Sequence, residues 1–181
     1  METPPGKLEC VITYLEMTEP PTSPAPPRPA AKLVLLRAES PTAAFYRFLY
    51  NNVGARWLWY ERRTLDDEAL EAIIQNPEVE IYVLHVHGVP AGFGELDLRK
   101  KPDIELTYFG LMSEFIGRGF GCYLLRWTVD QAWTRHPKRL WVRASNFAHP
   151  RVLGLYQRMG FVPYRQETTV IDDPRPMATL P

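Results

Sequence analysis

A glycine-rich segment, residues 116–121 (Ile-Gly-Arg-Gly-Phe-Gly), constrains the fold more than any other part of this chain. An apolar run over residues 104–112 precedes it and predicts a strand, and residues 122–133 follow it with the pattern of a helix. Glycines let backbone N–H groups converge on an anion, and the first turn of a helix presents unpaired N–H groups to the same point. The segment predicts an anion site at a strand-to-helix turn, although by itself it equally fits a tight connection.

The composition sets the class of protein. The 181 residues suit one domain, and 21 basic against 21 acidic residues leave a net charge of zero. Such a balance argues against nucleic acid or an acidic membrane surface as the main partner. No apolar run approaches the ~18 residues of a membrane-spanning helix, and no leader pattern is present. Cys10 and Cys122 lie far apart in the sequence and have no metal-ligand spacing, so we expect free thiols and a cytoplasmic protein.

Prolines divide the chain. Eight of the 18 prolines fall in the first 30 residues, most of them in the stretch 20–29, which predicts an extended loop. Residues 1–31 are therefore predicted to be an N-terminal extension, with an extra edge strand at 10–17 followed by this loop. A docking peptide is the alternative. Residues 32–171 are predicted to form the main domain, and residues 172–181 a C-terminal tail.

Hydrophobic periodicity and turn residues predict the remaining elements. Strands are expected at residues 32–38, 80–86, 89–98, 104–112, 139–144 and 161–171. Helices are expected from Ser40-Pro41 to Asn51, from Thr64 to Asn76, and over residues 122–133 and 150–159, the last ending at Gly160. The order predicts an α/β (α+β) fold with a mixed, largely antiparallel sheet flanked by helices.

Two common nucleotide-binding motifs do not fit the glycine segment. A P-loop needs Gly-Lys followed by Ser or Thr, which the chain lacks. A dinucleotide fingerprint needs glycine at the position of Cys122, within an early β-α-β unit.

A third possibility fits several segments at once. Residues 104–171 resemble the GNAT acetyltransferase superfamily, which transfers an acyl group from coenzyme A to an amine. Gly119 and Gly121 match the glycines of the family loop, and Arg118 matches a common basic residue, whereas Ile116 replaces the usual Gln or Arg. Residues 155–161 (Leu-Tyr-Gln-Arg-Met-Gly-Phe) resemble the family's Leu-Tyr-x-x-x-Gly-Phe block. His149 stands where many members have Asn.

The resemblance implies acetyl-CoA as co-substrate. Its pyrophosphate would rest on the loop amides, its pantetheine arm would lie along residues 109–111, and the Phe109 N–H would polarise the thioester carbonyl. The implied acetyl-CoA-binding residues are Phe109, Gly110, Leu111, Ile116, Gly117, Arg118, Gly119, Phe120, Gly121, Cys122 and His149.

The resemblance also implies the catalytic groups. Tyr156 matches the usual general acid, although a core tyrosine is the alternative. Glu105 matches a position that several members fill with a catalytic carboxylate, and period-two geometry would place it on one face with Thr107 and Phe109. A solvent-facing glutamate is the alternative, with Glu95 or Asp97 as substitute bases. Cys122 has no activating neighbour and is not expected to carry an acyl group.

The acceptor pocket is expected in the aromatic region 45–60, with Trp57, Trp59 and Tyr60 as its walls and Glu61 as the anchor for a cationic amine. His85 and His87 lack a third ligand, so no metal site is predicted.

We expect direct transfer of acetyl to a small-molecule or peptide amine, with no nucleic-acid or membrane partner. A homodimer is compatible with this prediction. The alternatives are a non-catalytic acyl-CoA sensor on the same fold and an interaction module that acts through the proline-rich arm.

Overall fold

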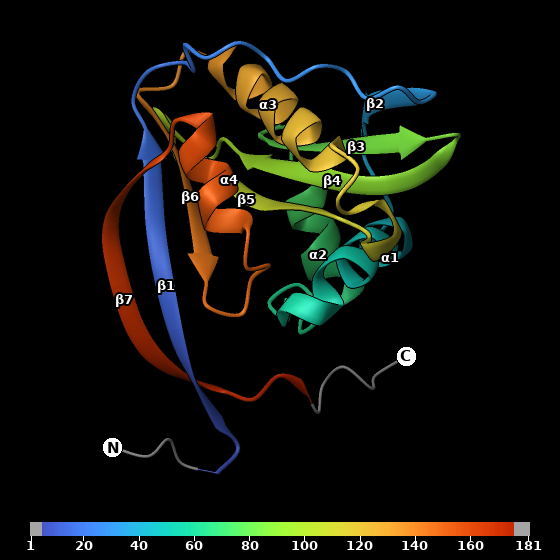
Figure 1. Cartoon of the computed structure of the whole chain (residues 1–181). Coiled ribbons are helices and arrows are strands. Elements are labelled where there is room, and N and C mark those ends of the chain that lie inside the picture. Colours follow the sequence, from blue (N-terminus) through green and yellow to red (C-terminus); the bar gives the residue numbers. More distant parts are fainter. Residues whose placement is uncertain (1–4, 176–181) are drawn as a thin grey trace.

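One seven-stranded sheet organises the chain in this computed structural model, which describes residues 5–175. The strand order is β2-β3-β4-β5-β6-β1-β7 (Figure 1), and neighbouring strands are antiparallel except for the parallel pair β5–β6. The strands are β1 (Lys7–Met17), β2 (Leu33–Arg37), β3 (Val79–Val86), β4 (Val89–Asp97), β5 (Asp103–Leu111), β6 (Arg139–Ser145) and β7 (Val162–Asp172). The predicted mixed, largely antiparallel sheet is confirmed.

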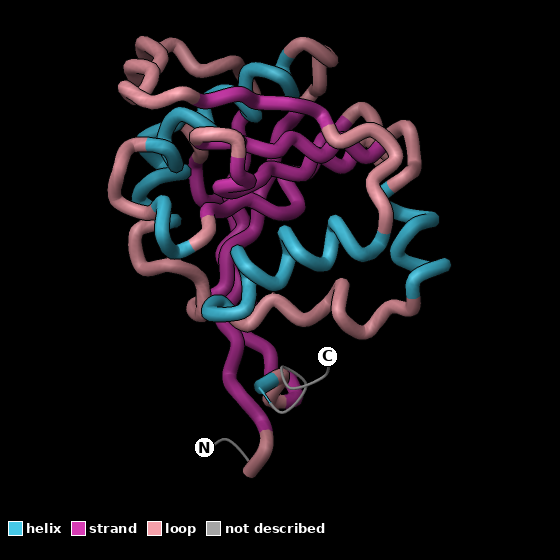
Figure 2. The backbone as a smooth tube through the Cα atoms, turned by 90° about the vertical axis from the view of Figure 1, so that its right-hand side faces the viewer, coloured by secondary structure: helices cyan, strands magenta, loops and turns pink. Residues whose placement is uncertain are grey.

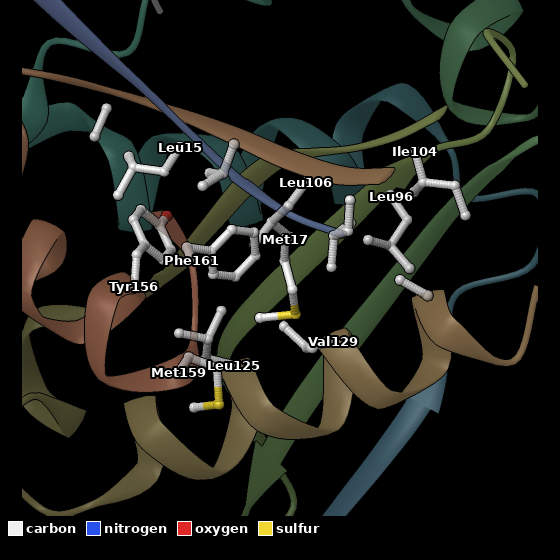
Figure 3. Packing of buried hydrophobic residues seen from close by; sticks show 14 of the residues in the cluster. Leu15, Met17, Leu96, Ile104, Leu106, Leu125, Val129, Tyr156, Met159 and Phe161 are labelled. Atoms are coloured by element: carbon white, nitrogen blue, oxygen red, sulfur yellow. The ribbon is translucent and has the colours of Figure 1, made fainter. Parts of the chain in front are cut away.

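Helices cover both faces of this sheet (Figure 1). The first pair, α1 (Ala43–Gly54) and α2 (Asp67–Ile74), packs on one face around the fully buried Tyr46, Leu70 and Phe93. The second pair, α3 (Phe120–Trp133) and α4 (Val152–Met159), packs on the other face, where Leu125 and Val129 meet Tyr156, Met159 and Phe161 (Figure 3). No helix within residues 5–175 is both long and apolar enough to cross a membrane.

Most predicted elements are found within two or three residues of their predicted bounds, and two of the differences concern the caps of helices. The first helix begins after Thr42, whose Oγ1 accepts from the Phe45 N–H at 3.3 Å, so the cap lies two residues beyond Ser40. Asp66 rather than Thr64 caps α2, because its carboxylate accepts from the Ala69 N–H at 2.8 Å. Gly160 ends α4 with a φ of 109°, as predicted.

The N-terminal strand β1 is not an edge strand, so that prediction is wrong. It lies between β6 and β7 and pairs with both, with Leu15 fully buried. After Met17 the proline-rich segment crosses α3 (Figure 1), where the Arg126 guanidinium donates to the Ser23 carbonyl at 2.7 Å. The chain then continues to β2 at the far edge of the sheet. The outer parts of β1 and β7 project together beyond the body (Figure 2).

A β-bulge in β5 determines which side chains face the site. Glu95 lies opposite Tyr108, but the next residue, Leu96, lies opposite Leu106, which leaves Thr107 as the extra residue. Side chains beyond the bulge therefore exchange faces. Leu106 belongs to the core under α3 and α4, whereas Tyr108 belongs to the core under α1 and α2.

Candidate active site

A cavity of about 400 Å³ opens where β5 and β6 separate. The two strands pair only from Asp103 to Leu106 and from Arg139 to Val142. Beyond these pairs, their facing edges form the walls of the cavity, with Thr107 to Leu111 on one side and Arg143 to Ser145 on the other. The cavity has a glycine-loop end, formed by residues 116–122, and a carboxylate end, formed by Glu61, Arg143 and the residues around them.

The glycine loop has the geometry of an anion cradle. Gly117 and Gly119 have φ values of 81° and 82°, and a Cβ added to either would meet no atom within 4 Å. Gly119 caps the N-terminus of the 14-residue helix α3, whose first turn contains Gly121 and Cys122. Open space, backbone amides and the positive end of a helix dipole together fit a phosphate group.

The side chains of Phe120 and Arg118, two residues predicted to bind acetyl-CoA, do not line the cavity. The Phe120 side chain is buried in the core, so only its backbone is available at the loop. Arg118 is exposed and its guanidinium lies over the rings of Phe120 and Phe115, with Cζ 5.1 and 6.0 Å from their centroids. Ile116, Cys122 and His149 all line the cavity.

The bulge corrects the predicted geometry of β5. Glu105 and Tyr108 share the face covered by α1, whereas Phe109 points to the opposite face and packs beside the Tyr156 ring, with centroids 6.2 Å apart. Glu105 and Phe109 therefore do not share a face. Gly110 lines the cavity, but the close approach that it permits is that of α1, since an added Cβ would lie 2.5 Å from Val53 Cγ1.

Tyr156 lies in the cavity wall between β5 and α4. Its side chain is 4% exposed and packs against Phe109. It also packs against Phe161 (Figure 3). Its hydroxyl makes no hydrogen bond to another residue within 5–175, and the hydroxyl oxygen is not fully buried. Burial raises the pKa of Tyr156 above its ordinary value of 10.0, so the phenol keeps its proton at neutral pH.

Two carboxylates share one guanidinium at the other end of the cavity. Arg143 Nη2 lies 3.3 Å from Glu61 Oε1, and Arg143 Nε lies 3.5 Å from Glu105 Oε1. Tyr108 donates to Glu61 Oε2 at 2.6 Å. Burial raises the pKa of Glu105, and Arg143 acts in the opposite direction. Glu105 does not line the cavity itself but lies beside Arg143, which does, whereas Glu61 lines the cavity directly.

The predicted aromatic residues Trp57, Trp59 and Tyr60 all line the cavity, and the two tryptophans also pack against other aromatic rings. Trp59 packs on Tyr50 and Tyr108 at centroid distances of 5.3 and 5.0 Å, so it is also part of the core. Trp57 meets His149 edge to face at 5.1 Å, which joins the loop after α1 to the loop before α4. Tyr60 precedes Glu61 in the same loop.

A buried ion pair anchors this loop. Arg62 Nη2 lies 2.7 Å from Glu95 Oε1, and the Glu95 side chain is fully buried. Tyr46 donates to the second carboxylate oxygen of Glu95. Burial acts to lower the pKa of Arg62, but Glu95, Tyr46 and Tyr108 together raise it, so the guanidinium stays charged. Glu95 is therefore occupied by a structural contact and is not a free base.

Several cavity residues were not predicted from the sequence. They come from β1, β6, the β6–α4 loop, α4 and β7, and include Cys10, Ile12, Arg143, Ser145, Phe147, Arg151, Arg158 and Ile171. Cys10 and Ile12 occupy alternate positions of a β-rich run, so they share a face, but only the placement of β1 inside the sheet brings that face to the site. The described residues contain no group of three metal-ligating side chains.

Several solved structures share the fold of this chain. A putative GNAT acetyltransferase from Novosphingobium aromaticivorans DSM 12444 has a TM-score of 0.58 at 16% identity, covering 94% of this chain and 68% of its own. A tandem GNAT protein from the clavulanic acid biosynthesis pathway has a TM-score of 0.63 at 17% identity, covering 90% and 52%. A functionally unknown conserved protein from Staphylococcus epidermidis ATCC 12228 has a TM-score of 0.60 at 16% identity, covering 93% and 64%.

A sequence model gives the family itself. The model of the acetyltransferase (GNAT) family matches residues 43–161, about two thirds of the chain, and the chain therefore belongs to that family. The matched region contains the glycine loop and the block with Tyr156, but it leaves out β1. No curated protein matches the chain. The chain spans 64% and 52% of the Staphylococcus and tandem structures, which are longer proteins.

Proposed function

We propose that this protein transfers acetyl directly from acetyl-CoA to a primary amine. The observation that supports it best is that one cavity connects the glycine loop to Tyr156, Glu61 and Arg143. Binding of acetyl-CoA requires a site for its phosphates, which the glycine loop offers. The reaction also requires a proton donor and a proton acceptor, and the phenol and the carboxylate pair can serve as these. Family membership supports the same reaction class.

Acetyl-CoA is the co-substrate in this proposal. The backbone amides of residues 117–122 hold its pyrophosphate, and Arg151 and Arg158, which line the same cavity, add positive charge for its phosphates. The pantetheine arm lies between the separated edges of β5 and β6. When it is bound, acetyl-CoA supplies an activated thioester, and a backbone N–H of β5, that of Phe109, is proposed to polarise the carbonyl.

The proposed proton transfers use groups at both ends of the thioester. Glu105, with its raised pKa, accepts the amine proton, through a water held by Arg143 or Thr107. The neutral amine attacks the thioester carbonyl, the C–S bond breaks, and Tyr156 donates its proton to the leaving thiolate. Tyr156 suits this role because it is protonated at neutral pH and its hydroxyl is free of other described partners.

The test is a pair of measurements on the full chain. Calorimetric titration should show binding of coenzyme A, and release of free thiol from acetyl-CoA should depend on an added amine. Coenzyme A binding without turnover on any amine would favour the alternative of a non-catalytic sensor. We also propose a reducing, cytoplasmic setting, because Cys10 and Cys122 are both unpaired.

A further inference from the structure

The carboxylate end of the cavity has mainly apolar walls. Its lining includes Cys10 and Ile12 of β1, Ile171 of β7, and Trp57, Leu58 and Tyr60 after α1. Cys10 is 6% exposed. These side chains present few hydrogen-bonding groups, so they favour an apolar body over a sugar or another polyhydroxylated one.

Two carboxylates against one guanidinium give this end of the cavity an excess negative charge. Glu61 and Glu105 both lie within 3.5 Å of Arg143. The field of Glu61 extends to the apolar wall, because it adds to burial in raising the pKa of both Cys10 and Tyr60. A cation entering between these walls would be stabilised, and an anion would be repelled.

Arg143, a cation close to the carboxylate end, already faces two carboxylates. Its guanidinium faces Glu61 through Nη2 and Glu105 through Nε, and the Tyr108 hydroxyl fixes Glu61 from the other side. A substrate carboxylate at this guanidinium would lie beside Glu61 and Glu105, and both would repel it. The other arginines of the cavity, Arg151 and Arg158, belong to the opposite wall at α4.

We propose that the acceptor is a small monoamine with an aromatic or aliphatic body and no carboxylate beside the amine, that is, an arylalkylamine or a similar compound. This inference rests on the proposed function. In the bound state, the ammonium group meets Glu61 at the cavity wall, and its apolar body contacts Cys10, Ile12 and Tyr60. The amine then loses its proton toward Glu105 before it attacks the thioester.

Three matched acceptors test the substrate class. Thiol release is measured with tryptamine, tryptophanamide and tryptophan, which share one ring system and differ beside the amine by hydrogen, a neutral amide and a carboxylate. We expect kcat/KM for tryptamine to exceed that for tryptophan by about 100-fold, because Glu61 and Glu105 repel the carboxylate of tryptophan. Tryptophanamide should lie within about tenfold of tryptamine, since it adds bulk but no charge.

Two variants test the role of Glu61. Glu61→Gln should raise KM for tryptamine by about tenfold, with a smaller effect on kcat, because the carboxylate binds the ammonium group in the ground state. Glu9→Gln is the matched control: Glu9 is an exposed residue of β1, next to Cys10 but on the opposite face. Its kinetics should equal those of the wild type.

The outcomes separate this inference from the proposed function. Equal or faster turnover of tryptophan, or a preference for a polyhydroxylated amine such as kanamycin, would overturn the acceptor class and leave acetyl transfer intact. An unchanged KM in Glu61→Gln would overturn the assigned anchor. Coenzyme A binding without turnover of any amine would overturn both the inference and the proposed function.

Discussion

Arg143 of β6 lies 3.5 Å from Glu105 of β5, at the point where the two strands stop pairing. The contact spans the opening of the cavity, and the same guanidinium also faces Glu61 from the loop after α1. Three separate segments therefore meet through one side chain. Because Arg143 opposes the effect of burial on the pKa of Glu105, it lowers the pH above which that carboxylate is ionised.

The first prediction concerns pH. Glu105 acts as a base only when it is ionised, so kcat/KM should rise with pH through the Glu105 pKa, which burial places above its ordinary value of 4.5. Replacing Arg143 with Gln removes a charge that lowers this pKa, so the acidic limb should move to higher pH. The measurement is kcat/KM against pH, with saturating acetyl-CoA, for both proteins.

A charge-matched control shows whether the shift is local. Arg165→Gln removes an exposed arginine of β7 that lies over the Tyr14 ring, and its pH profile should match that of the wild type. An acidic limb that stays in place in Arg143→Gln would exclude Glu105 as the titrating base.

The second prediction concerns Tyr156. Tyr156→Phe should lower kcat by about 10²-fold, the lower bound for a lost proton donor, and should leave coenzyme A affinity unchanged. Because the hydroxyl has no partner within residues 5–175, the free energy of unfolding should change by less than about 1 kcal/mol. The rate of thiol release measures kcat, and urea denaturation measures the free energy of unfolding. Tyr164→Phe, on the exposed strand β7, is the control; undiminished turnover in Tyr156→Phe would leave Tyr156 as a core tyrosine.

Local patterns were sufficient for much of this fold. The hairpin turn at His87-Gly88, the glycine cap at Gly160 and the loop before α3 depend on backbone conformations that neighbouring residues encode. The glycine loop and the aromatic loop were predicted from local patterns of the same kind. Each belongs to one continuous segment whose composition is informative by itself.

Long-range relationships were beyond those patterns. The position of β1 between β6 and β7 depends on pairing across more than 120 residues, for example Tyr14 with Arg143, and a short β-rich run does not specify its partner. The bulge at Thr107 has no signature in an alternating strand, so Glu105 and Phe109 were assigned to one face. Arg143 was missed because its importance comes only from the two carboxylates beside it.

The third prediction concerns the glycine loop. An alanine at Gly119 must adopt a φ of 82°, which costs about 1–2 kcal/mol, and its methyl group enters the open cradle. Gly119→Ala should therefore weaken coenzyme A binding by more than its effect on stability. Gly88→Ala provides the comparison, because Gly88 has a φ of 88° and similar open space in a hairpin turn away from the cavity. Calorimetric titration of both variants should show normal affinity only in Gly88→Ala; equal affinities would remove the loop from the binding site.

The fourth prediction concerns the ion pair under the aromatic loop. Glu95→Gln leaves the Arg62 charge buried with a weaker partner. It should lower the free energy of unfolding by about 3 kcal/mol, because the buried charge is no longer compensated by an opposite charge. Glu78→Gln breaks the exposed pair with Lys101, whose side chains are 45% and 61% exposed, and should cost less than about 1 kcal/mol. Guanidinium denaturation compares them. Equal small losses would show that Arg62 does not depend on Glu95.

The fifth prediction concerns β1, which lies outside the region matched by the family model. Leu15 is fully buried between the sheet and α4, so Leu15→Ala should cost about 2–5 kcal/mol, as in other cores. Val170→Ala, on the neighbouring strand with 54% exposure, should cost less than about 0.5 kcal/mol. Removal of residues 1–17 should abolish cooperative unfolding, because it leaves β6 and β7 without the strand that joins them. That deletion therefore cannot isolate the role of the proline-rich segment. A truncated chain that unfolds cooperatively with wild-type stability would show that β1 is dispensable to the sheet.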